Sequence, residues 1–384
     1  MWAYVFSFLG STLCVYSAEK VNSKEIQRIL LFLAVLITSL LAAFRALNIG
    51  TDVMNYVQPM FVNAQKANNF SEYLTSTILN DWQLVPISSF EYGYTSLVFI
   101  CAKFFGNIFS LLFITQFIIV GCIVIGLWRQ KKELSVSLGI FSYYLLFYNT
   151  SLNMVRQSIA MSLLFMAFSY LKDRKNITYF ILMIIAISFH RTAIIGGIIF
   201  ILYIYFGKNS RNIKFTNNFS LSAQSFKLIL VGIVSFAIVL IPSVFQLVLK
   251  FLGVSEYAEG YITNTVHFSL NGSLICLLII LIVMLCWNSL SNDNLKYLYV
   301  GLLICALATI QLTTASAYAS RISLYFTMFY VYIIPTFLNN TSSRTKKVIL
   351  IILILLMYLY WYYTIVYLKY NATVPYIISP NLNF

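Results

Sequence analysis

Arginine side chains lie near the ends of several long apolar segments, where a charged group is costly unless it is paired or solvated. Four of them are predicted at the same surface of a membrane: Arg45, Arg156, Arg191 and Arg321. A guanidinium group stays charged and binds the oxygens of a phosphate two at a time. These four residues are therefore candidate ligands of a diphosphate group, although an ion-paired or snorkelling structural role explains any single one of them equally well.

Three further side chains near these arginines could remove a proton from a hydroxyl group: Asp52, Glu91 and His190. Such a base must reach the hydroxyl with a suitable pKa. Each residue also has a structural explanation of similar weight. Asp52 follows Gly50 and can cap a short helix, Glu91 is favoured by the dipole at a helix N-terminus, and a lone histidine commonly makes structural hydrogen bonds. The sequence alone does not choose the base among the three.

Polar and aromatic residues beside these groups are candidates for binding a substrate. Gln157 lies one helical turn after Asn153 and shares its helix face, next to Arg156. Tyr56 and Tyr94 could stack on sugar rings, although tyrosine is also common at ordinary membrane interfaces. No metal and no other cofactor is expected, because the six cysteines stand singly in apolar stretches and no residues have metal-ligand spacing.

The composition of the 384-residue chain is that of a membrane protein. It has only 25 Lys and Arg and 11 Asp and Glu, 60% of its residues are hydrophobic, and its mean hydropathy is +0.85. These values exclude a water-soluble globular domain. The apolar runs lack the alternation of a membrane β-barrel, so they predict an all-α polytopic membrane protein. About twelve transmembrane helices are predicted, at residues 2–18, 28–47, 107–128, 134–150, 153–171, 176–190, 192–206, 228–249, 271–290, 297–314, 321–337 and 348–367.

Basic residues set the predicted orientation, because Lys and Arg accumulate in cytoplasmic loops. Twelve helices place 17 of the 25 basic residues inside and eight outside, with both termini outside. The whole chain, 1–384, then forms a single integral membrane domain with two long outer segments, 48–106 and 250–270. The first should contain amphipathic, interfacial helices, including 91–105, which is too short to cross the bilayer comfortably. Topology thus explains the net charge of +14, and no nucleic-acid partner is expected.

Six short motifs follow one another along most of the chain. They are Arg45 with Gly50-x-Asp52-x-x-x-Tyr56, Glu91-x-Gly93-Tyr94, Arg156-Gln157-x-x-Ala160, His190-x-Thr192-Ala193, Arg321, and Pro375-Tyr376. In this order and spacing they resemble the EpsG-like branch of the Wzy-type O-antigen and polysaccharide polymerases. The resemblance adds Tyr376 to the candidate substrate-binding residues. Residues 207 to 290 contain no motif that matches the family.

The resemblance implies a glycosyltransferase that polymerises repeat units of O-antigen (lipopolysaccharide), capsule or exopolysaccharide at the periplasmic face of a bacterial inner membrane. The growing glycan would pass from polyprenyl (undecaprenyl) diphosphate to a sugar hydroxyl of the next lipid-linked repeat. The implied partners are polyprenyl-diphosphate-linked oligosaccharide, membrane lipid and a candidate chain-length regulator protein. The four arginines would stabilise the departing diphosphate, and Asp52, Glu91 or His190 would take the proton.

Two other functions fit the same residues. A flippase that transports the lipid-linked saccharide also suits many helices and a basic cavity. Transporters often have internal repeats and a site at the bilayer midplane, however, and the sequence indicates neither. An O-antigen ligase, which transfers finished glycan to another acceptor, would share the polymerase chemistry, and only the resemblance favours polymerisation.

Overall fold

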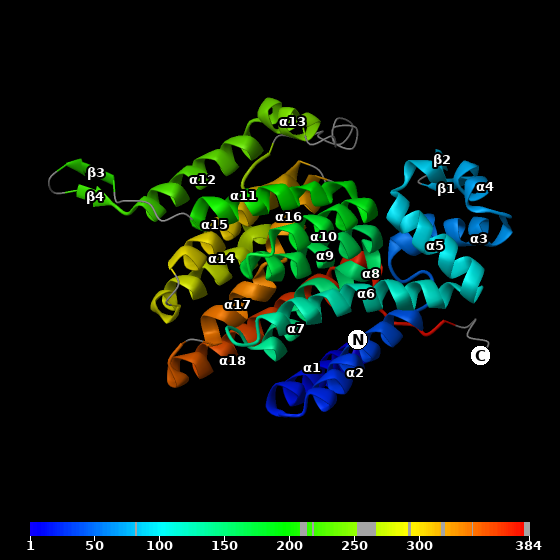
Figure 1. Ribbon diagram of the computed structural model, residues 1–384, viewed down its shortest axis with the longest axis horizontal. Helices are drawn as coiled ribbons and strands as arrows, with labels where there is room; N and C mark the ends of the chain where they lie inside the picture. The colour runs from blue at the N-terminus through cyan, green and yellow to red at the C-terminus, as the bar shows by residue number, and fades with distance from the viewer. Residues whose placement is uncertain are drawn as a thin grey trace. The chain divides into compact units, whose positions relative to one another are not determined.

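The computed structural model describes residues 1–80, 83–207, 213–216, 219–251, 266–290, 293–315, 319–339 and 341–379. Within these ranges the chain is predominantly helical, with two short antiparallel strand pairs (Figure 1). It divides into two compact units, Met1–Ala193 with Leu353–Phe384, and Ile194–Ile352. The helical content confirms the all-α fold class.

Apolar helices with small residues at their contacts form most of the first unit. They are α1 (Trp2–Lys20), α2 (Lys24–Ala43), α6 (Ile108–Arg129), α7 (Val136–Tyr143), α8 (Asn149–Asn153), α9 (Val155–Lys172), α10 (Asn176–Phe189) and the later part of α18 (Ser343–Trp361). Ser11 of α1 donates a hydrogen bond of 2.8 Å to the Ala34 carbonyl of α2, so these two backbones lie close together. Serine and alanine also occupy much of the buried surface of α9, which packs against α6 and α10.

The predicted outer segment 48–106 folds beside the N-terminal end of α6 (Figure 1). It contains a π-helical turn (Val53–Val57), α3 (Gln58–Lys66), α4 (Phe70–Thr75), β1 (Thr77–Asn80), β2 (Gln83–Pro86) and α5 (Tyr92–Phe105). The sequence predicts the helices but not the β1–β2 hairpin, because two four-residue strands are too short to display a clear alternation. Gly106 ends α5 in the left-handed conformation, with φ +64°.

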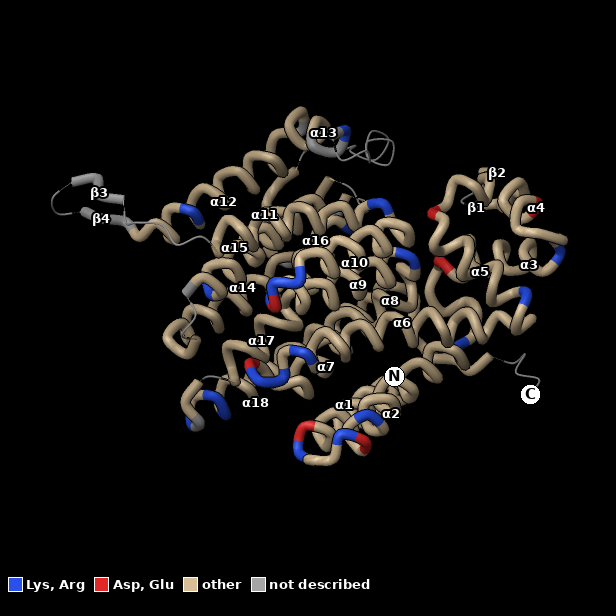
Figure 2. Tube along the Cα trace, viewed as in Figure 1, with Lys and Arg blue, Asp and Glu red and all other residues tan. Residues whose placement is uncertain are grey.

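Ion pairs lie at the far ends of α6 and α9 from this segment. Arg129 pairs with Asp173, and Lys172 pairs with Glu133 at 2.6 Å. The Glu19 carboxylate, near the end of α1, accepts a 2.6 Å hydrogen bond from the first backbone N–H of α7. Figure 2 shows charged residues gathered at helix ends and in turns, with long uncharged stretches between them. This distribution is typical of helices in a membrane.

The second unit is also mainly helical. Its elements are α11 (Gly196–Gly207), β3 (Ile213–Thr216), β4 (Phe219–Leu221), α12 (Ala223–Leu240), α13 (Pro242–Phe251), α14 (Leu270–Leu285), α15 (Asp293–Ile310), α16 (Ser323–Thr327), α17 (Tyr330–Asn339) and the start of α18. Val239, Phe245 and Leu312 belong to a buried cluster that joins α12, α13 and the end of α15. Most of the predicted outer segment 250–270 falls at 252–265, outside the described residues.

Helix length and composition bear on how many segments cross the membrane. Among the described residues, five helices are long and apolar enough to do so: Lys24–Ala43, Ile108–Arg129, Ala223–Leu240, Asn294–Thr314 and Arg344–Tyr367. Others, such as the 14-residue α10, are apolar but shorter than the roughly 20 residues that a bilayer core needs. The protein is therefore a helical membrane protein, and the count of twelve crossings stays a prediction.

Candidate functional site

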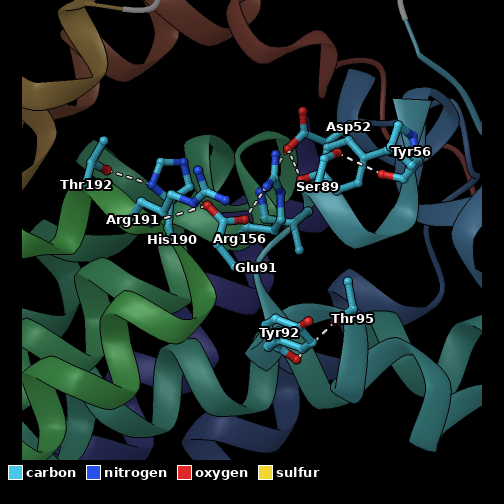
Figure 3. A network of polar contacts seen from close by, with 12 residues as sticks. Asp52, Tyr56, Ser89, Glu91, Tyr92, Thr95, Arg156, His190, Arg191 and Thr192 are labelled. Carbon is cyan, nitrogen blue, oxygen red and sulfur yellow. Dashed lines mark hydrogen bonds and ion pairs between the residues drawn. The ribbon is translucent and has the colours of Figure 1, made fainter. Parts of the chain in front are cut away.

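Asp52 joins the outer segment to the start of α9. Its carboxylate accepts hydrogen bonds from the Tyr56 hydroxyl, one turn further along, and from the backbone N–H of Val155 at 3.2 Å (Figure 3). Burial and then the Asp52 carboxylate raise the pKa of Tyr56 well above its ordinary value, so that hydroxyl stays protonated and donates. The sequence predicts that Asp52 caps the short helix that it begins, but its side chain makes no capping hydrogen bond there. It binds instead the first backbone N–H of α9, the helix that carries Arg156.

Glu91 and Arg156, which are 65 residues apart in sequence, form an ion pair (Figure 3). The Arg156 guanidinium lies 4.8 Å from the ring centres of both Tyr56 and Phe90, a favourable cation–π geometry. The second oxygen of Glu91 accepts a hydrogen bond from the backbone N–H of Arg191 at 3.2 Å. Glu91 is only 7% exposed, so one buried carboxylate connects α5, α9 and the turn after α10.

The surroundings of Glu91 hold it in its charged form. Burial alone would raise its pKa, but the positive charge of Arg156, the nearby His190 and backbone hydrogen bonds together lower the pKa below its ordinary 4.5. A carboxylate held this firmly is a weak base. The ion pair with Arg156 and the hydrogen bond from Arg191 favour a positioning role for Glu91, and the choice of base stays a prediction.

Replacing Glu91 by glutamine should destabilise the protein at neutral pH by on the order of 3 kcal/mol, because Arg156 would keep a buried charge without its carboxylate. A folded-state pKa below the unfolded one means that the pair stabilises the fold above about pH 4.5 and loses this effect as the pH falls toward the lowered value. Thermal unfolding in detergent from pH 3 to 8 should therefore show a gap between parent and Glu91→Gln that closes in acid. Glu72→Gln, at an exposed carboxylate of α4, is the control. A gap that stays constant across this range would contradict the assignment.

His190 and Arg191 lie directly after α10. The imidazole Nδ1 of His190 and the Thr192 hydroxyl oxygen are 2.6 Å apart and share a hydrogen bond (Figure 3). This hydrogen bond orients the imidazole ring. The Arg191 side chain is exposed, whereas its backbone N–H is bound to Glu91. Sequence reasoning named both residues but not the role of Thr192, although the hydroxyl two positions after the histidine could have suggested it.

Two glycines allow the outer segment to approach the helices so closely. Gly50 has φ +83°, and a Cβ atom there would lie 2.4 Å from the Leu152 carbonyl oxygen. A Cβ atom on Gly93 would lie 2.7 Å from the carbonyl oxygen of Ser188, near the end of α10. The sequence predicts a tight turn at Gly50, but neither close approach. These contacts position Asp52 and Glu91, respectively, against α9 and the turn that holds His190.

Arg45 and Tyr376 lie where the C-terminal tail of the first unit packs against the end of α2. Arg45 is 2% exposed and donates a 3.1 Å hydrogen bond to the carbonyl of Leu152, one turn before Arg156. Its backbone pairs with Ile378. The Tyr376 hydroxyl donates to the Leu41 carbonyl at 2.8 Å, so this ring anchors the tail to α2.

The three remaining residues of the predicted site are Tyr94, Gln157 and Arg321. Tyr94 is buried and makes an edge contact with Tyr56, with the ring centres 6.0 Å apart. Gln157 is buried on α9, beside Arg156. Arg321 belongs to the second unit, in the 3-10 turn Ala319–Ile322, and its membership of this site stays a prediction.

The described residues contain no group of three His, Cys, Asp or Glu side chains that could hold a metal ion. What the site does hold is two carboxylates, an imidazole and a set of guanidinium groups at the junction of the outer segment with α9 and α10. Such a set can accept a proton and stabilise a departing anion.

Comparison with known proteins yields one match that covers most of the chain. The model of a family described as the EpsG family matches residues 28–378, which include every predicted site residue. Neither the curated proteins nor the solved structures contain a match.

Proposed function

Since the chain belongs to the EpsG family, which is associated with glycosyltransferase-like polymerisation of polysaccharides, we propose that it polymerises oligosaccharide repeats carried on polyprenyl diphosphate. The observation that carries this proposal is the network in which Glu91 binds Arg156 and the Arg191 backbone, while Asp52 caps the helix of Arg156. A reaction that needs a base for a hydroxyl and cations for a departing diphosphate suits these groups.

The proposed reaction is a displacement at the first carbon of the growing glycan. A hydroxyl oxygen of the incoming repeat forms a bond to that carbon, while the bond from the carbon to the diphosphate oxygen breaks. The electron pair of the broken bond leaves with polyprenyl diphosphate, and the hydroxyl proton passes to Asp52 or His190. Glu91 positions the cations around it in this scheme.

The arginines then differ in how they act on the diphosphate. Arg191 has an exposed side chain that can bind phosphate oxygens directly. Arg156 is fixed by Glu91 and two aromatic rings, so its charge stays in place as the leaving group departs. Arg45 is buried against the Leu152 carbonyl, so in this proposal it contributes its positive charge and makes no direct contact with the diphosphate. Arg321 stays a diphosphate ligand predicted from the sequence, and no metal or other cofactor takes part.

The proposed location is a bacterial inner membrane, with the site facing the periplasm and a chain-length regulator as a protein partner. The basic residues at the far ends of α6 and α9 support this orientation, because cytoplasmic loops are enriched in Lys and Arg.

In a variant that lacks the six native cysteines, a single cysteine at position 174, in the turn between α9 and α10, should be inaccessible to an impermeant thiol reagent added outside cells whose inner membrane is intact. It should react once the membrane is opened. A cysteine at exposed Ser71 of the outer segment is the matched control and should react in both cases. Labelling of position 174 from outside would reverse the orientation.

The purified protein, incubated with lipid-linked repeat units, should produce a ladder of glycan lengths and release polyprenyl diphosphate. The ladder should persist in chelator, because the arginines rather than a metal neutralise the leaving group. Cells that lack the protein should keep a single capped repeat and lose longer chains. Complete loss of surface sugar would instead indicate a flippase or a ligase, and a ladder that chelator removes and magnesium restores would contradict the arginine-based account.

A further inference from the structure

A small open cavity lies in the first unit, between the end of the α7–α8 segment and the end of α18. Its volume is about 80 Å³, and its walls include Leu146, Asn149, Ile365 and Asn371. Because a water molecule needs about 10–15 Å³ of such space, the cavity has room for about five to eight non-hydrogen atoms. That is one edge of a sugar ring with its substituent.

The backbone around the cavity departs from regular α-helix on both sides. One wall comes from the π-helical turn Tyr144–Tyr148 and the other from the π-helical turn Tyr362–Tyr367. Such turns are rare and are frequently found at functional sites. At the mouth, Asn371 has φ +66°, a conformation that asparagine adopts more readily than most residues.

The chemistry of the walls selects a neutral, polar ligand. None of the described residues that line the cavity carries a charge, so it does not suit a diphosphate or a lipid phosphate. Asparagine and threonine supply donors and acceptors on one side, while Leu146 and Ile365 supply an apolar wall. Tyr360 and Tyr370 add aromatic rings. A saccharide has this same combination of hydroxyl or amide groups and apolar C–H faces.

The polar wall is held in place before any ligand arrives. The Asn149 amide accepts a hydrogen bond from the Trp361 indole at 2.8 Å and donates one to the Thr373 hydroxyl at 2.9 Å. Asn371 donates to the Thr150 hydroxyl at 3.2 Å. A pre-organised polar wall lowers the entropy that binding must overcome.

A chain of hydrogen bonds runs from the cavity to the candidate site. Asn371 accepts from the Asn153 amide at 3.3 Å, and Asn153 in turn accepts from the backbone and hydroxyl of Thr51, at 2.8 and 2.7 Å. Thr51 is the neighbour of Asp52. The cavity therefore shares a rigid polar connection with the loop that carries a proposed base.

We infer that this cavity is a saccharide subsite, which holds one edge of a sugar of the lipid-linked repeat beside the Asp52 loop. The inference rests on the proposed function for the identity of that sugar. The subsite fixes the register of the glycan relative to the reacting groups, and its walls contribute to the choice of repeat unit.

Saturation-transfer NMR between the purified protein and the free repeat-unit oligosaccharide, released from its lipid, tests the subsite without requiring polymerisation. The parent should transfer saturation to the sugar. Leu146→Trp, which fills the cavity, and Asn371→Gly, which keeps the left-handed backbone but removes the amide, should each lower the transfer about tenfold. Ile125→Trp, on an exposed face of α6, should match the parent. Equal transfer in parent and folded Leu146→Trp, or no transfer in the parent, would overturn the subsite.

The same variants separate this inference from the proposed function. With lipid-linked repeats, both cavity variants should raise KM about tenfold while kcat changes little, because they remove binding that is distant from the reacting atoms. Oligosaccharide binding in a protein that makes no polymer would support the subsite and refute the polymerase. Polymer formation with an unchanged KM in both folded variants would refute the subsite and support the polymerase.

Discussion

Replacing Arg156 by alanine should abolish polymer formation. The guanidinium is fixed between Glu91 and the rings of Tyr56 and Phe90, where it can meet the charge that develops on the departing diphosphate. Loss of one such interaction in the transition state costs about 3 kcal/mol, which corresponds to a rate decrease of about a hundredfold. Arg156→Lys keeps the charge but loses the planar guanidinium, which stacks on aromatic rings and binds two phosphate oxygens at once. Only partial activity should therefore return. Glycan ladder length and initial rate are the measurements.

A purely structural role for Arg156 makes a different prediction. Alanine would then leave the Glu91 carboxylate buried without its cation, and folding would fail together with activity. The double variant Arg156→Ala/Glu91→Gln separates the two effects, because it removes both charges. We expect this variant to recover monodisperse protein in detergent but not polymer. Recovery of polymer along with folding would remove Arg156 from the site.

Arg129 supplies a matched control at the opposite end of the first unit's helices. It also pairs with a carboxylate, Asp173, and its guanidinium lies 3.7 Å from the ring centre of Tyr170. Arg129→Ala therefore removes the same kind of ion pair and cation–π contact. It should leave the ladder unchanged, since the proposed reaction takes place at the other membrane surface. Loss of polymer in both alanine variants at normal protein levels would show that the assay does not distinguish the site from the scaffold.

Helical segments were predictable from the sequence because their signals are local. Long apolar runs predicted α2 and α6, and both were found within a few residues of the predicted bounds. The predicted segment 134–150 is helical as well, but it contains a π-helical turn at Tyr144–Tyr148 that hydrophobicity does not reveal. Apolar length alone likewise cannot say whether the 14 residues of α10 cross a bilayer.

Pairings within the candidate site were not predictable, because they depend on tertiary contacts. The sequence predicts separate roles for Glu91, as a base, and for Arg156, as a diphosphate ligand, although the two side chains bind each other across 65 residues. The sequence predicts that Asp52 caps its own helix, whereas its carboxylate binds the first N–H of α9 and makes no capping hydrogen bond to the turn that follows it. The backbone hydrogen bonds between the C-terminal tail and the residues around Arg45 are also not predictable, because they do not depend on the types of the side chains.

Gly93 has a structural role that its place in a short motif does not reveal. It lies where the first turn of α5 meets the backbone of Ser188. This contact requires the absence of a Cβ atom, and it leads to the second large effect that we expect.

Gly93→Ala should reduce polymer formation by at least about tenfold, even though alanine favours helix more than glycine does by about 1 kcal/mol. A Cβ atom would lie 2.5 Å from the Ser188 hydroxyl and 2.7 Å from its carbonyl oxygen, so α5 must move away from α10. Glu91, two residues earlier, would then lose its 3.2 Å hydrogen bond from Arg191 N–H. A shift of 1 Å in a positioning contact can cost about a hundredfold in rate. The measurement is the initial rate of ladder formation, together with the apparent unfolding temperature.

Gly121→Ala is the matched control, because Gly121 also lies in a helix of the first unit and a Cβ atom there would meet nothing within 4 Å. It should keep full activity and a normal or slightly raised unfolding temperature, as expected from helix propensity alone. Gly93→Ala should differ from it in activity far more than in stability, because a displaced α5 can stay folded while Glu91 no longer supports Arg156 and the His190 turn. Full activity in folded Gly93→Ala would mean that the docking of α5 on α10 does not position the reacting groups. Equal losses of activity and unfolding temperature would instead make this contact a general requirement of the fold.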